Sequence, residues 1–66
     1  MIVKPDRVKV ISEMAQKEIT CKELIEVTGL SPLTVTNIRK GKKCNFLTLK
    51  SIASALGVPV ENILEV

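Results

Sequence analysis

Residues 20–43 read TCKELIEVTGLSPLTVTNIRKGKK, and this stretch carries the signals that decide the fold. Thr20 can cap a helix with its side-chain oxygen, while Glu23, three residues later, can reach back to the backbone N–H of Thr20. This reciprocal arrangement is a capping box, which marks the N-terminus of a helix. We therefore expect a helix over residues 21–28.

A second start signal follows, at Ser31. Ser31 can cap a helix, and Pro32 occupies the first helical position, where a missing N–H costs nothing. Gly29 stands just after the first helix and suits the left-handed backbone that ends one. Together the signals predict a helix-turn-helix unit over about residues 20–40, with its second helix over about residues 32–40.

The second helix is expected to have two different faces. At 100° per residue, Val35 and Ile38 fall on one side and should face the core. The opposite side carries an aliphatic, a hydroxyl, an amide and an ammonium group, on Leu33, Thr36, Asn37 and Lys40. A face meant only for solvent usually holds Glu, Lys and Gln, which form helices better than Thr and Asn do. The stripe therefore favours recognition over simple solvation.

The groups of this stripe match the edges of DNA bases. Asn37 can bond adenine in bidentate fashion, and the Leu33 side chain or the Thr36 methyl can contact a thymine methyl. Lys40 can reach guanine or a backbone phosphate. The stripe is therefore a candidate surface for contact with base edges.

Two neighbouring segments suit phosphate groups. Gly41 is placed to end the second helix, and a basic loop of Lys42, Lys43, Cys44 and Asn45 follows it. The N-terminus of the first helix attracts anions through its dipole and unpaired N–H groups, with Thr20 and Lys22 placed to assist. Residues 27–60 contain five cations and no carboxylate, so one side of the molecule should be positive.

The remaining segments are interpreted as a scaffold. Residues 1–5 are expected to be frayed or extended. A helix from about residue 6 to residue 17 should turn its apolar residues inward, namely Val8, Ile11, Met14 and Ala15. Asn45 should cap a core helix that ends at Gly57 and has the apolar face Phe46, Leu49, Ile52, Ala53 and Leu56. A last short helix is expected over about residues 60–64.

Length and composition exclude several classes of protein. Sixty-six residues permit one domain, residues 1–66, with a small aliphatic core. Cys21 and Cys44, without any histidine, fall short of a structural zinc site, so no metal and no cofactor is expected. No secretory signal, long apolar run or disulfide framework is visible, which favours a reduced cytoplasmic protein. The absence of histidine, of a phosphate-binding glycine loop and of paired carboxylates predicts no enzyme activity and no small-molecule substrate.

The order of these features resembles a known family. The matching patterns are T-x-x-E-L-x-x-x-T-G-L-S-x-x-T-V-x-x-I-x-x-G-K over residues 20–42 and N-F-L-T-L-x-x-I-A-x-A-L-G-V over residues 45–58. They are similar to the Cro/C1-type (XRE-like) helix-turn-helix family of phage repressors and bacterial transcriptional regulators. The resemblance implies an all-α fold, a compact five-helix bundle of the lambda-repressor-like class that binds duplex DNA. It also implies that the helix over about residues 32–40 lies in the major groove.

The resemblance also implies which residues contact DNA. Base contacts are expected from the start and outward stripe of the second helix, at Pro32, Leu33, Thr34, Thr36 and Asn37. Phosphate contacts are expected from Thr20, Cys21, Lys22, Lys42, Lys43, Cys44 and Asn45. Cys21 stands where the family often has glutamine, and the segment before Thr20 lacks the usual glycine.

Two functional hypotheses of different classes remain open. The first is a sequence-specific transcriptional regulator, a repressor by resemblance, which binds a pseudo-palindromic site as a homodimer with half-sites about one helical turn apart. Its two-fold interface would use the apolar tail, Val58, Val60, Ile63 and Val66. The second is a protein-interaction module, antitoxin-like or an adaptor, with weak or no DNA binding. The apolar Pro32 and Leu33 on the second helix motivate it.

Overall fold

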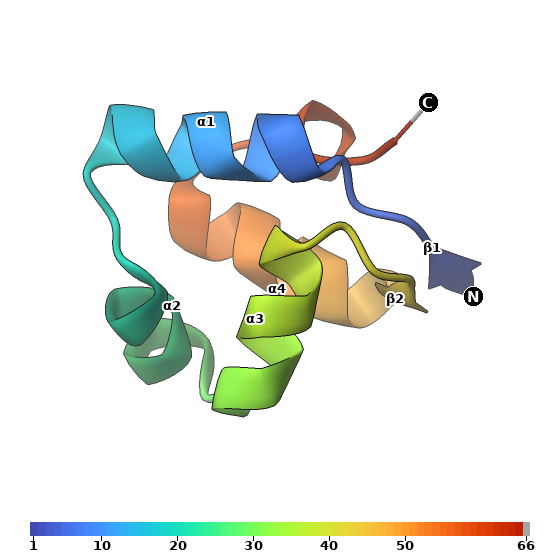
Figure 1. Ribbon diagram of the computed structural model, residues 1–66, viewed down its shortest axis with the longest axis horizontal. Coiled ribbons are helices and arrows are strands. Elements are labelled where there is room, and N and C mark those ends of the chain that lie inside the picture. The colour runs from blue at the N-terminus through green and yellow to red at the C-terminus, as the bar shows by residue number, and fades with distance from the viewer. Residues whose placement is uncertain (66) are drawn as a thin grey trace.

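The computed structural model describes residues 1–65, in which helices dominate. The α-helices of this part of the chain are α1 Arg7–Lys17, α2 Cys21–Thr28, α3 Pro32–Arg39 and α4 Phe46–Leu56. Two short strands, β1 Ile2–Val3 and β2 Cys44–Asn45, and one 3-10 turn, η1 Val60–Asn62, complete the order. In Figure 1, α1 runs across the top, α3 lies in front of α4, and α2 is at the lower left.

Each α-helix begins at a side-chain cap. The Asp6 carboxylate accepts the N–H of Lys9 at 3.1 Å and caps α1. The capping box at α2 is formed in both directions, with Thr20 Oγ1 and Glu23 Oε1 each accepting the other residue's backbone N–H at 3.2 Å. Ser31 Oγ accepts the N–H of Thr34 and starts α3, as the sequence predicted.

The core is aliphatic and receives side chains from every α-helix. Its buried members are Val10, Met14, Leu24, Val35, Ile38, Leu49, Ile52, Ala53, Leu56 and Ile63. α3 contributes Val35 and Ile38, each 1% exposed, which confirms the predicted inward face of that helix. Phe46, expected in the core, is only half-buried.

The predicted inward face of α1 is right for Met14 and wrong for Val8, Ile11 and Ala15, which are exposed. Val10 is fully buried and Met14 is 8% exposed, whereas Val8 and Ile11 are 66% and 43% exposed. Val10 and Met14 are four residues apart, so they satisfy helical periodicity as well as the predicted set does. Packing of α1 against α3 and α4 selects between the two faces.

The predicted fifth helix is a single 3-10 turn, η1, followed by an extended segment. Its N-cap, Pro59, makes no side-chain hydrogen bond, and a segment this short has little to gain from helical propagation. Ile63, after η1, is fully buried and closes the core against α4. The apolar tail is therefore largely used inside the molecule, and Val66 lies outside the described residues.

The N-terminal segment is ordered by pairing, where the sequence predicted a frayed or extended end. β1 pairs with β2 in an antiparallel register, Ile2 with Asn45 and Val3 with Cys44. On its other side, the Lys4 carbonyl accepts the Glu65 N–H at 2.9 Å, and the Lys4 ammonium pairs with the Glu65 carboxylate. The all-α expectation thus needs a correction, because a small sheet joins residues distant in the chain. Within residues 1–65, no helix has the length and apolar character to cross a membrane.

Candidate nucleic-acid interface

The turn between α2 and α3 holds the two helices at a defined angle. Gly29 ends α2 with φ +72°, and its N–H donates to the Ile25 carbonyl at 2.9 Å. Leu30 and Leu24 then bury the turn against the core, with Leu24 1% exposed. This geometry leaves the other side of α3 facing outward.

The outward side of α3 forms a ridge that is open to solvent, defined by Leu33, Thr36, Asn37 and Lys40. Leu33 is 70% exposed, Lys40 is exposed, and Thr36 and Asn37 are half-buried. Among the described residues, the Thr36 and Asn37 side chains make no hydrogen bond, so their polar groups are available. Pro32, at the start of the helix, is exposed, while the Thr34 hydroxyl is 2.8 Å from that of Ser31.

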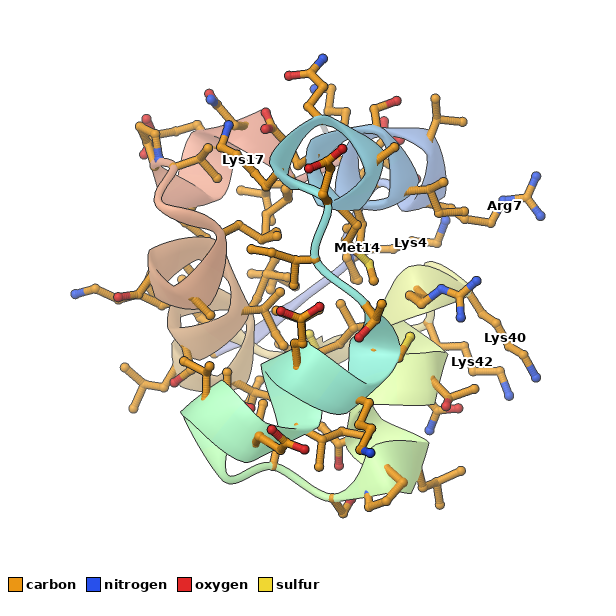
Figure 2. The ribbon with its side chains drawn as sticks, turned by 90° about the vertical axis from the view of Figure 1, so that its left-hand side faces the viewer. Lys4, Arg7, Met14, Lys17, Lys40 and Lys42 are labelled. Atoms are coloured by element: carbon orange, nitrogen blue, oxygen red, sulfur yellow. The ribbon has the colours of Figure 1, made fainter. Side chains whose placement is uncertain are left out.

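The end of α3 sets the direction of the basic loop. The Lys42 N–H donates to the Asn37 carbonyl at 3.0 Å and the Gly41 N–H to that of Ile38 at 3.0 Å, which together form a Schellman motif. Gly41 takes the left-handed conformation, φ +78°, that this motif requires. Lys42 and Lys43 follow directly and are both exposed. Lys42 extends from the same side of the molecule as Lys40, the last residue of the ridge (Figure 2).

The predicted phosphate residues differ in how free their side chains are. Lys22 is exposed, but the Thr20 hydroxyl is engaged in the capping box, and the Asn45 amide oxygen accepts the Leu47 N–H at 2.9 Å. Cys44 is half-buried against the core, and this burial raises the pKa of its thiol. The side chains of Thr20, Cys44 and Asn45 are therefore less free for a phosphate contact than that of Lys22, and the Thr20 N–H is itself donated to Glu23 Oε1.

The N-terminus of α2 takes part in a contact that the sequence interpretation missed. The Arg39 Nη1 donates to the Cys21 sulfur at 3.1 Å, which brings a guanidinium from the end of α3 to the start of α2. The residues are 18 positions apart, so no local pattern could reveal the contact. Cys21 is the first residue of α2, as the sequence predicted, and Arg39 adds a positive charge beside it.

The sequence interpretation did not include a cation that lies at the start of α1, Arg7. Figure 2 shows Arg7, Lys40 and Lys42 extending from the same side of the molecule, while Lys17 extends from another side. Arg7 is exposed and lines a depression with Thr36 and Lys40. The positive face therefore includes α1 as well as α3 and the basic loop.

Comparison with known families gives a match over most of the chain. Residues 9–66 match the Cro/C1-type HTH DNA-binding domain. The chain belongs to this family. No curated protein and no solved structure gives a significant match.

Membership of the Cro/C1-type family confirms the resemblance drawn from residues 20–58 and identifies the chain as a DNA-binding helix-turn-helix domain. The Cro/C1-type match begins within α1, so it covers α2, α3 and α4 completely. It supports a DNA-binding regulator in general terms.

Proposed function

We propose that this protein is a sequence-specific, duplex-DNA-binding transcriptional regulator, with α3 in the major groove and α2 crossing the backbone above it. Base contacts would come from Pro32, Leu33, Thr34, Thr36, Asn37 and Lys40. Phosphate contacts would come from Thr20, Cys21, Lys22, Lys42, Lys43, Cys44 and Asn45. The proposed action on transcription is repression.

One observation carries this proposal: the exposed ridge of α3 stands directly beside an exposed basic loop. The ridge provides short directional groups, on Thr36 and Asn37, that can read base edges. The loop provides ammonium groups, on Lys42 and Lys43, that neutralise phosphates. Both kinds of contact are needed at once, because phosphate contacts position a protein on DNA and base contacts select the sequence.

The proposed homodimer would use the C-terminal apolar segment. Since Ile63 is fully buried, the surface that residues 58–65 offer for this dimer consists of the half-buried Val58, Val60 and Leu64. A small interface of this kind fits a dimer that forms mainly on DNA. Sedimentation of the protein alone and with duplex DNA tests this part of the proposal.

The test of the function is selection of bound sequences from a random duplex library. We expect enrichment of a pseudo-palindrome with half-site centres about 10 base pairs apart. Recovery of no enriched sequence, although the protein binds duplex DNA, would contradict sequence specificity. Recovery of single, unpaired half-sites would contradict the proposed dimer but not the proposed sequence specificity.

A protein-interaction module is the second candidate, supported by the 70% exposure of Leu33 on α3. An apolar side chain on an exposed helix also suits a groove on a partner protein. The two functions differ in salt dependence. DNA binding should weaken by orders of magnitude between about 50 and 200 mM salt, whereas apolar association should change little.

A further inference from the structure

A depression of about 220 Å³ lies between α1 and α3 and is lined by Arg7, Ile11, Thr36, Arg39 and Lys40. Three of these residues are cations, and no carboxylate lines the depression. The ion pairs recorded among residues 1–65 join Lys4 to Glu65 and Lys17 to Glu13, so the three cations enter none of them. Asp6 is the nearest acid in sequence, but its carboxylate accepts the Lys9 N–H.

Arg7 is held beside the end of α3 by the backbone. A Cβ placed on Gly41 would lie 3.3 Å from the Arg7 Cβ and 3.4 Å from the Pro5 carbonyl oxygen. Gly41 is buried, and it follows directly after the cap of α3. The start of α1 therefore touches the turn that leads from α3 into the basic loop. This contact fixes the position of the Arg7 backbone and Cβ.

Arg7 is also in an unfavourable position for the stability of its own helix. It is the first residue of α1, where the helix dipole is positive, and no acidic residue stands in the first turn. Two further cations lie across the depression and repel it. A residue that destabilises its own helix, with no compensating contact in the protein without its ligand, is expected at a functional site.

We propose that this depression binds a phosphate of the DNA backbone, with Arg7 and Arg39 as its guanidinium ligands and Lys40 and Thr36 at its border with the ridge. The inference rests on the proposed function and adds to it, because it makes α1 part of the DNA interface. Guanidinium groups bind phosphate oxygens in bidentate fashion, and a phosphate in this place would relieve the repulsion between the cations. Thr36 and Lys40 belong to both surfaces, so the phosphate would lie next to the bases read by α3.

The test measures how the affinity for a short mixed-sequence duplex depends on salt. Arg7→Gln should lower the slope of log K against log salt by about 0.9, the value for one phosphate contact on B-DNA. Arg39→Gln should do the same, and the two losses should not add in the double variant, because both guanidinium groups are needed to hold the same phosphate. Lys50→Gln is the matched control, because Lys50 is an exposed cation that lines a different depression, between α2 and α4. Its slope should equal that of the wild type.

Folding and charge are controlled separately. Removal of a cation from the N-terminus of α1 should not lower the melting temperature, which circular dichroism can verify. Arg7→Lys should keep the slope, because it keeps the charge. An unchanged slope for Arg7→Gln, or an equal fall for Lys50→Gln, would overturn this inference and leave the proposed function intact. Absence of any salt-dependent DNA binding by the wild type would overturn both.

Discussion

The Arg39 guanidinium donates to the Cys21 sulfur at 3.1 Å and so ties the C-terminal end of α3 to the first residue of α2. Both residues lie where the two helices approach the same stretch of DNA backbone in the proposed complex. The contact predicts that chemistry at one cysteine controls the charge of the interface. Cys21 is a free, half-buried thiol.

Carboxymethylation of Cys21 should weaken binding to every duplex. Iodoacetate would add a carboxylate beside Arg39, which neutralises that cation and repels phosphate, and we expect a loss of about tenfold in affinity. Iodoacetamide adds a neutral group of nearly the same size and should cause a smaller loss. Fluorescence anisotropy in a Cys44→Ala background measures both. Equal losses of affinity with the two reagents would show that the size of the added group, and not its charge, weakens binding.

Asn37 and Lys42 should differ in what they control. Lys42→Ala should weaken binding to all sequences alike and reduce the salt slope by about one. Asn37→Ala should instead change the preference among sequences, because its amide is proposed to read a base edge, at about 1–3 kcal/mol for a bidentate contact. Gel shifts on a panel of duplexes separate the two. Identical behaviour of both variants would refute this division of roles.

Ile38 and Leu33 provide a matched pair on α3 for stability. Ile38 is 1% exposed, so Ile38→Ala should lower the free energy of unfolding by about 2–5 kcal/mol through lost burial and a cavity. Leu33 is 70% exposed, and Leu33→Ala should stay within about 0.5 kcal/mol of the wild type. Urea denaturation measures both. A large loss for Leu33→Ala would mean that the ridge is packed against the protein.

Gly41 and Gly29 separate backbone strain from crowding. Both adopt positive φ, +78° and +72°, so alanine at either position should cost about 1–2 kcal/mol of stability. A Cβ on Gly29 meets nothing within 4 Å, whereas one on Gly41 meets Arg7 and Pro5. Gly41→Ala should therefore cost at least about 1 kcal/mol more than Gly29→Ala. Equal melting temperatures of the two variants would contradict the close contact between α1 and α3.

Cys44 makes stability depend on pH in the alkaline range. Burial raises the pKa of its thiol in the folded protein, while the unfolded chain loses the proton near the ordinary pKa of about 8.5. Its contribution to stability is thus complete below that value and is lost as pH rises through the folded pKa. The free energy of unfolding should fall from about pH 8.5 upward. Cys44→Ala should show a smaller fall in urea titrations.

Much of the helical framework was predictable because its signals are local. Thr20 with Glu23, Ser31 with Pro32, and Asn45 each act within one helical turn, and all three mark the observed starts of helices. The openness of the α3 ridge also followed from local periodicity, since burial of Val35 and Ile38 forces the opposite face outward. The contacts of this ridge with DNA stay predictions.

The sequence alone determined where the α-helices begin and end, because caps, glycines and periodicity act between residues a few positions apart. Only the tertiary structure decided which face of α1 is buried and that β1 pairs with β2. It also decided that Arg7 joins the positive face and that Arg39 reaches the N-terminus of α2. These outcomes depend on contacts between residues far apart in the chain. On α1 alone, either Val8 or Val10 could be the buried valine. Packing of α1 against α3 and α4 buries Val10 and leaves Val8 exposed.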